Sequence, residues 1–218
     1  MIDSSVTEIA AALQGINSPP QSDESRLRIR LLRLVAEGRP VSRSQVEQTA
    51  ASLQMSLAAA TSFVEKVSER DEEGNIVGIL GLSQRNHPHQ FKVNGRVLST
   101  WCAWDALFLP PLLGQQAEVE STCPVTQARV RVRITPEQVE EIDPPESVIS
   151  IAVPKLDAAS LKSVETIWKT FCCLVHFFVS PESALEWISA KQHDLKVLSV
   201  EDGFLLGRMF FEHTLEYV

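Results

Sequence analysis

The order of hydrophobic and polar positions predicts a run of short helices in the first third of the chain. Leucines recur at the spacing of one helix face from Arg26, and Gly38 with Pro40 ends that helix. Two further helices are expected after Ser42 and Ser56, because a hydroxyl at the N-cap accepts from a free backbone N–H of the first turn. The chain therefore begins as a helical unit.

Strand-like pieces follow a turn at residues 71–75. They are expected at 76–82, 90–93 and 96–99, and the last two are joined by Asn94-Gly95, a dipeptide typical of tight hairpins. Three helices followed by a β-hairpin is the order of a winged-helix domain. We therefore predict a winged-helix-like N-terminal domain over residues 1–99.

The character of the chain changes from Trp101. A short buried helix is expected at 101–109, ended by Pro110-Pro111. Strands are predicted at 117–122, 128–134, 147–153, 171–179 and 197–200, helices from 135, from 180 and over 203–217, and a looped or partly helical connection at 155–170. The fold class is α+β, with a second, mixed α/β catalytic domain of short antiparallel sheets over residues 100–218.

Composition excludes several classes of function. The hydrophobic share of 44% and charged share of 22% are those of a globular protein, and the net charge of −8 disfavours nucleic acid as a partner. The third predicted helix carries Glu65, Lys66, Glu69 and Arg70 toward and beyond its end, a balanced face rather than a basic one. The apolar run 171–179 is far shorter than the roughly 20 residues that cross a bilayer, so we expect no membrane association and a cytoplasmic location.

The four cysteines carry the candidate chemistry, because thiols in a reducing compartment serve reactivity, metal binding or packing. Cys102 and Asp105 are three residues apart, so on a helix their Cβ atoms would lie roughly 5–6 Å apart. Cys172 and Cys173 are adjacent, and alternation along a strand lets only one of them face a given site. Cys123 and Cys173 are interpreted as small buried side chains.

Other uses of these thiols have requirements of their own. A structural zinc site would need a C-x₂₋₄-C spacing on a tight turn, which is missing, and His176 is interpreted as a packed core histidine. A thiol hydrolase would need a histidine beside a cysteine and an oxyanion hole, and no spacing implies either. A thiol protein that binds or delivers metal without turnover, and a metal-sensing winged-helix regulator, both stay open as alternatives.

Four motifs occur in this chain order: Gly38-Arg39-Pro40-Val41-Ser42-Arg43, Asp71-x-x-Gly74-Asn75-Ile76-x-Gly78, Trp101-Cys102-Ala103-x-Asp105 and Phe171-Cys172-Cys173-x-Val175-His176-Phe177-Phe178. Together they resemble the bacterial organomercurial lyases, also called alkylmercury lyases. The similarity extends from about residue 26 to about residue 210. The last two motifs are specific as a pair.

The resemblance implies an enzyme that cleaves the carbon–mercury bond by protonolysis and releases a hydrocarbon and Hg²⁺. By matching positions, Cys102 and Cys172 are the catalytic thiols that hold mercury, and Asp105 is the acid and a further mercury ligand. The implied partners are an organomercurial substrate, low-molecular-weight thiols and a mercuric reductase as acceptor of Hg²⁺, with no cofactor. Leu174 stands where relatives carry a histidine and Trp104 where a smaller aliphatic residue is usual, departures that concern substrate range.

The chemistry of the residues agrees independently with this assignment. Mercury is a soft metal that prefers thiolates, and a thiol must lose its proton to bind well. Asp105 can take that proton and later deliver it to carbon. A pocket lined by residues such as Trp101, Phe108 and Phe177 would suit alkyl and aryl groups and raise the pKa of the carboxyl by desolvation.

Overall fold

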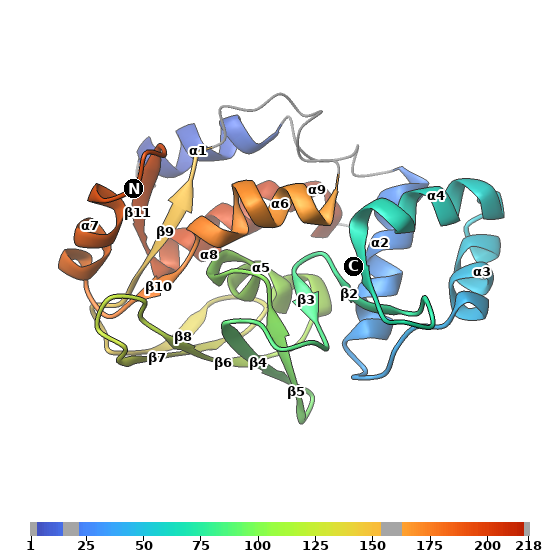
Figure 1. Ribbon diagram of the computed structural model, residues 1–218, viewed down its shortest axis with the longest axis horizontal. Coiled ribbons are helices and arrows are strands. Elements are labelled where there is room, and N and C mark those ends of the chain that lie inside the picture. The colour runs from blue at the N-terminus through green and yellow to red at the C-terminus, as the bar shows by residue number, and fades with distance from the viewer. Residues whose placement is uncertain (1–3, 15–21, 154–162, 216–218) are drawn as a thin grey trace.

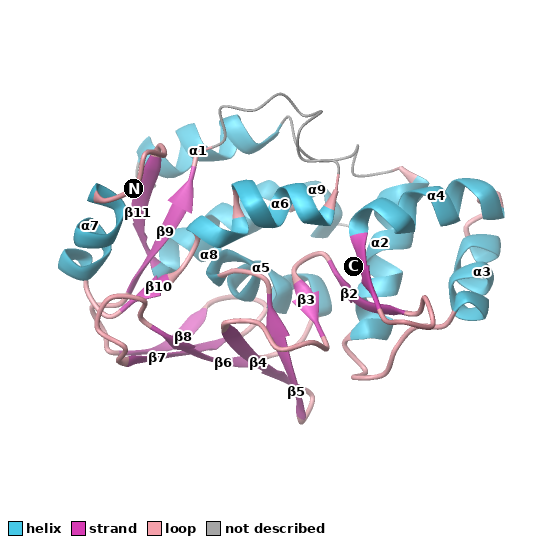
Figure 2. Cartoon of the chain, viewed as in Figure 1, coloured by secondary structure: helices cyan, strands magenta, loops and turns pink. Residues whose placement is uncertain are grey.

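The computed structural model describes residues 4–14, 22–153 and 163–215 of the chain (Figure 1). Helices and antiparallel strands occur in separate runs along much of the sequence, and this mixture confirms the α+β class (Figure 2). Figure 1 shows α2, α3 and α4 at one end of the molecule and a three-stranded sheet with α7 at the other.

The N-terminal helices are α1 (Ser4–Gln14), α2 (Asp23–Val35), α3 (Arg43–Ser52) and α4 (Leu57–Val67). Each of the last three begins at a serine N-cap, and Ser42 with Gln45 forms the predicted capping box. The second helix buries one apolar stripe that includes Leu27, Leu31 and Val35, as its spacing predicted.

The main sheet is antiparallel and has the strand order β1-β2-β3-β5-β4-β6-β7-β8. Its strands are β1 (Ser68–Arg70), β2 (Ile76–Ile79), β3 (Leu82–Ser83), β4 (His89–Val93), β5 (Arg96–Thr100), β6 (Ala117–Thr122), β7 (Arg129–Ile134) and β8 (Val139–Asp143). The hairpin at Asn94-Gly95 is confirmed, since Val93 pairs with Arg96. Strand β5, which ends at residue 100, and strand β6, which follows it in the sequence, both pair with β4. The domain boundary after residue 99 and the winged-helix assignment stay predictions.

A second sheet has the order β10-β9-β11 and is also antiparallel. The remaining elements are β9 (Val148–Ala152), β10 (Phe177–Phe178), β11 (Leu195–Ser199), α5 (Ala103–Leu113), α6 (Val164–Thr170), η1 (Cys172–Leu174), α7 (Pro181–Ser189), α8 (Val200–Phe210) and α9 (Glu212–Leu215). Helix α5 contacts strands of both sheets as well as α8, so it forms the centre of the core. All of its residues are buried.

Several predicted elements are wrong. Helix α5 continues through Pro110 and Pro111 to Leu113, and Gly114 ends it with φ 65°. Burial of the whole helix outweighs the hydrogen bonds that the prolines remove. The expected helix from residue 135 is a turn leading into β8, because Thr135 N–H donates to the Gln138 carbonyl.

The predicted strand 171–179 is a 3₁₀ turn, η1, followed by the two-residue strand β10. A short apolar run does not by itself distinguish a strand from a buried turn. The predicted strand 76–82 is interrupted by a turn at Leu80-Gly81. The predicted connection at 155–170 is confirmed as partly helical at α6. Residues 154–162 lie outside the described residues, as do residues 216–217 of the last predicted helix.

Within the described ranges, no helix combines the length and the hydropathy needed to cross a bilayer.

Candidate active site

Cys102 and Asp105 lie at the start of α5, where the helix begins two residues later than the sequence pattern predicted. Cys102 is the N-cap residue, and Asp105 Oδ2 accepts from the Cys102 backbone N–H at 2.7 Å. This is a capping box, in which an acidic side chain at N3 satisfies the N-cap amide. The pair is therefore brought together by the helix start rather than by a shared helix face.

Cys172 approaches Cys102 and Asp105 from a segment that is distant in the sequence. It lies in η1, and two hydrogen bonds hold the segment behind it: Ser150 Oγ donates to the Leu174 carbonyl at 2.8 Å and accepts from His176 N–H at 3.0 Å. Ala103 N–H donates to the Val175 carbonyl at 3.2 Å, which ties the start of α5 directly to this segment. The turn thus places one thiol of the adjacent pair toward the core.

The three predicted site residues come together. One ligand atom each of Cys102, Asp105 and Cys172 lies within 4.8 Å of the other two, and the residues are 0%, 7% and 5% exposed. Cys173 is exposed, so its interpretation as a small buried side chain is wrong, while Cys123 is buried in a separate small cluster that includes Phe178. Only the predicted thiols converge with the carboxyl.

Burial governs the protonation of this group. Desolvation raises the pKa of Asp105 to about 7, against the hydrogen bonds from Cys102 and the charge of His87, which lower it. Burial also raises the pKa of Cys102 well above its ordinary value. The hydrogen bond with Cys102 lowers the pKa of Cys172, but burial and the Asp105 charge outweigh it. Both thiols are protonated in the resting site, beside a carboxyl that can either hold or release a proton at neutral pH.

The aromatic residues expected around the site are buried, although they are not all neighbours. Trp101 precedes Cys102, and its ring lies 6.0 Å from the ring of Trp168 on α6. The ring centroids of Phe108 and Trp104 lie 5.2 Å apart, and those of Phe177 and His89 lie 5.7 Å apart.

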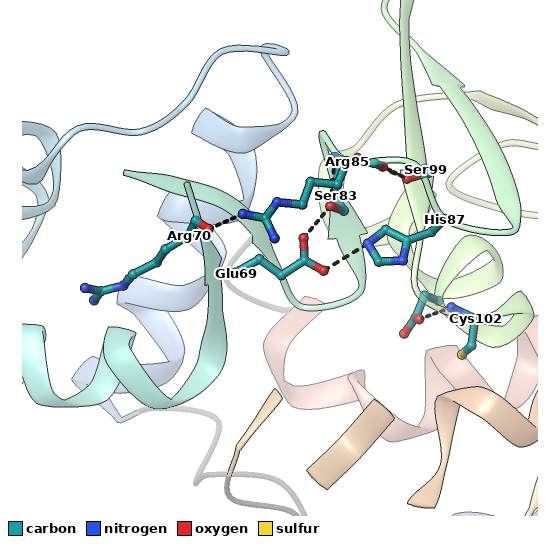
Figure 3. A network of polar contacts seen from close by, with 8 residues as sticks. Glu69, Arg70, Ser83, Arg85, His87, Ser99 and Cys102 are labelled. Atoms are coloured by element: carbon teal, nitrogen blue, oxygen red, sulfur yellow. Dashed lines mark hydrogen bonds and ion pairs between the residues drawn. The ribbon is translucent and has the colours of Figure 1, made fainter. Parts of the chain in front are cut away.

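Two features next to the site were missed by the sequence analysis. Gly81 lies so close to Asp105 that a Cβ there would be 2.4 Å from the carboxyl carbon. Farther out, the buried Glu69 accepts from Ser83 Oγ at 2.5 Å and lies 3.0 Å from His87 Nε2 (Figure 3). The isolated glycine in an apolar run and the histidine after a strand were weak signals, because only the fold brings them to Asp105.

The geometry describes a site that can bind a soft metal through two thiols and pass a proton to a group bonded to that metal. Comparison with known proteins agrees. The family model described as "MerB: Alkylmercury lyase" matches residues 82–212. An alkylmercury lyase of Pseudomonas putida is 38% identical over 211 residues, covering 96% of this chain and 93% of the relative. One of Streptomyces lividans is 39% identical over 190 residues, covering 85% and 81%.

A solved structure described as the mercury-bound form of MerB2 has the same fold. Its TM-score is 0.73 with 20% sequence identity, and the match covers 97% of this chain and 100% of that one. The chain belongs to the alkylmercury lyase family, and it is an enzyme of the lyase class.

Proposed function

We propose that this chain cleaves the carbon–mercury bond of alkyl- and arylmercury compounds at Cys102, Asp105 and Cys172, by protonolysis, in the detoxification of organomercury. The observation that carries the proposal is the convergence of two buried thiols and one carboxyl within 4.8 Å. A soft metal with a carbon substituent fits this donor set, because thiolates bind mercury more strongly than hydroxyl or carbonyl oxygens do.

The first step is capture of R–Hg by the thiols. Each thiol loses its proton as the sulfur–mercury bond forms. One proton passes to Asp105, the adjacent base, since its Oδ2 already lies at the Cys102 amide, and the other leaves as HX with the anionic ligand X⁻ that the thiols displace from mercury. A carboxyl whose pKa lies at about 7 exchanges protons efficiently near neutral pH.

The second step is cleavage. Two thiolates add electron density to mercury and weaken its bond to carbon, and the protonated Asp105 delivers its proton to that carbon. The hydrocarbon leaves, and Hg²⁺ stays on Cys102 and Cys172, with Asp105 as a further ligand. The low exposure of these three residues favours this step, because bulk water does not compete with the carbon atom for the proton of Asp105.

Completion of the cycle requires partners outside the chain. Low-molecular-weight thiols remove Hg²⁺ from the two sulfurs by ligand exchange, and a mercuric reductase is the proposed acceptor. The site's reaction requires no cofactor, and a cytoplasmic location supplies the necessary thiols in reduced form.

The direct test is release of benzene from phenylmercury in the presence of excess thiol. We expect benzene in many-fold molar excess over the enzyme, and its absence would leave a protein that binds or delivers metal without turnover.

Asp105→Asn separates capture from cleavage. Both thiols remain, so the variant should still retain phenylmercury after desalting, but the proton donor is lost and benzene release should fall by about 10²–10⁴-fold. The asparagine oxygen can still accept from Cys102 N–H, which preserves the start of the helix. Benzene release at the wild-type rate would show that the proton comes from another group.

A further inference from the structure

Trp168 is connected to both thiols of the site. It belongs to α6, which ends two residues before Cys172. Its ring meets the ring of Trp101, the residue before Cys102, edge-on at 6.0 Å, and it meets the ring of His87 edge-on at 4.7 Å. Aromatic rings from three separate segments of the chain therefore meet beside the site.

The contact between Trp101 and Trp168 adjoins the proton donor. Trp101 N–H donates to the Gly81 carbonyl at 2.9 Å, and Gly81 packs directly against the carboxyl group of Asp105. In the proposed reaction, the carbon that takes the proton must lie beside this carboxyl, so the rest of the organic group occupies space next to Asp105. The two indoles supply aromatic surface on this side of the site.

The contacts of Trp168 differ from those of a core residue. Helix α6 has no buried residue, and Trp168 is half-buried at the edge of the core. Within the described part of the chain, neither Trp101 Nε1 nor Trp168 Nε1 has a hydrogen-bond partner, although both atoms are screened from solvent. No hydrogen bond therefore fixes either indole, and the two rings can adjust to a ligand.

Trp104, which the sequence analysis connected with substrate range, has the contacts of a core residue. It is 4% exposed, and its Nε1–H donates to the Gly203 carbonyl at 3.0 Å. Its ring also packs against Phe108 within the same helix. The hydrogen bond ties α5 to α8, so this indole is fixed in the interior.

We propose that Trp168 is a specificity-determining residue, which together with Trp101 forms an aromatic surface for the organic group and favours arylmercury over alkylmercury substrates. This inference rests on the proposed function. An aryl ring can meet an indole edge-on, as the two indoles meet each other, whereas a saturated group of the same size gains contact area without this interaction. One such contact corresponds to about 2–10-fold in kcat/KM.

The test compares phenylmercury with cyclohexylmercury, whose organic groups are similar in size. The measured quantity is the ratio of kcat/KM for the two substrates, from release of benzene and of cyclohexane with excess thiol. Because each variant is compared with wild type on the same two substrates, the intrinsic reactivity of each carbon–mercury bond cancels.

Trp168→Leu keeps an apolar side chain but removes the ring, so the ratio of phenyl- to cyclohexylmercury should fall about 2–10-fold. The fall should appear as a higher KM for phenylmercury with kcat little changed, because the surface contacts the ring equally before and during cleavage. Trp168→Phe keeps an aromatic ring and should keep most of the ratio.

Trp187→Leu is the matched control. Trp187 is also half-buried, and its ring packs against Phe178 in the separate cluster that contains Cys123. Its ratio should equal that of wild type. An unchanged ratio in Trp168→Leu would overturn the inference, as would an equal loss for both substrates, which is the result expected of a purely structural residue.

Retention by Asp105→Asn distinguishes failure of this inference from failure of the proposed function. In a mixture of equal phenyl- and cyclohexylmercury with excess thiol, Asp105→Asn should retain more phenylmercury after desalting, and adding Trp168→Leu should reduce this preference. The competition requires no cleavage, so an unchanged preference would overturn the inference alone. Absence of benzene and cyclohexane release by wild type would instead overturn the proposed function.

Discussion

Three side chains carry the proposed chemistry, and burial changes how each of them behaves. A thiol in water is partly ionised near its ordinary pKa, whereas the raised pKa values of Cys102 and Cys172 keep both protonated until mercury displaces the proton. Asp105 is the one group of the three whose pKa, about 7, allows both protonation states at neutral pH. Loss of either thiol should therefore have a different consequence from loss of the carboxyl.

Serine at either thiol position should abolish turnover. Cys102→Ser and Cys172→Ser each replace a sulfur with a hydroxyl that neither ionises near neutral pH nor binds soft mercury comparably, so benzene release should fall below detection. Benzene release with phenylmercury and excess thiol measures the effect, and substantial activity in either variant would remove that residue from the site.

Cys123→Ser is the matched control for these variants. Its side chain is fully buried away from the site, so the hydroxyl should cost about 1–3 kcal/mol of the free energy of unfolding, with activity per folded molecule unchanged. A stable but inactive Cys123→Ser protein would contradict the assignment.

Among the elements, the turn between β2 and β3 has the closest relation to the site. Ile79 pairs with Leu82 across it, and both turn residues have positive φ, 52° at Leu80 and 86° at Gly81. Leucine rarely adopts this conformation, and such strain is often found beside functional sites. Gly81 packs directly against the carboxyl group of Asp105, and the Gly81 carbonyl accepts from Trp101 N–H at 2.9 Å.

Gly81→Ala should displace the acid. The new Cβ would lie 2.4 Å from the carboxyl carbon and oxygen of Asp105, so that side chain must move. A misplacement of about 1 Å can cost about 10²-fold in rate, and we expect that loss in benzene release with phenylmercury capture retained.

Gly95→Ala is the matched control for the turn. Gly95 occupies the corresponding hairpin position between β4 and β5, at φ 71°, with open space around its Cβ position. Alanine there should carry only the backbone cost of about 1–2 kcal/mol, which a denaturation curve measures. Equal activity losses in the two variants would show that Gly81 acts through stability alone.

At the scale of the whole molecule, the buried carboxyl makes stability depend on pH. Folding raises the pKa of Asp105 from 3.8 to about 7, so the folded state favours the protonated form. The stabilising contribution of this proton is complete below the unfolded pKa and is lost as pH rises to about 7.

Urea denaturation of the mercury-free protein tests this dependence. Asn at position 105 is neutral at every pH, so the free energy of unfolding of wild type relative to Asp105→Asn should decrease between about pH 4 and pH 7 and level off above it. A difference that stays constant with pH would mean that Asp105 is ionised in the folded protein throughout.

Local signals in the sequence determined the helix starts, the hairpin and two of the three site residues. Ser42 with Gln45 and Asn94 with Gly95 form their cap and turn from neighbouring residues, so their structure was predictable from the sequence. Cys102 and Asp105 are likewise three residues apart, and a hydrogen bond from the Cys102 backbone N–H to the Asp105 side chain holds them together. Family resemblance added Cys172, because its motif is specific even though its conformation was predicted wrongly.

Tertiary structure decided everything that depends on distant contacts. Whether 171–179 is a strand or a turn depended on Ser150, whose hydroxyl binds the backbone of that segment from β9. Gly81 and His87 approach Asp105 only because β3 and the residues after it pack against α5. The protonation of the acid follows from its 7% exposure. Packing between distant segments determines which side chains are buried. The sequence alone therefore identified the reacting groups, and the fold determined their pKa values.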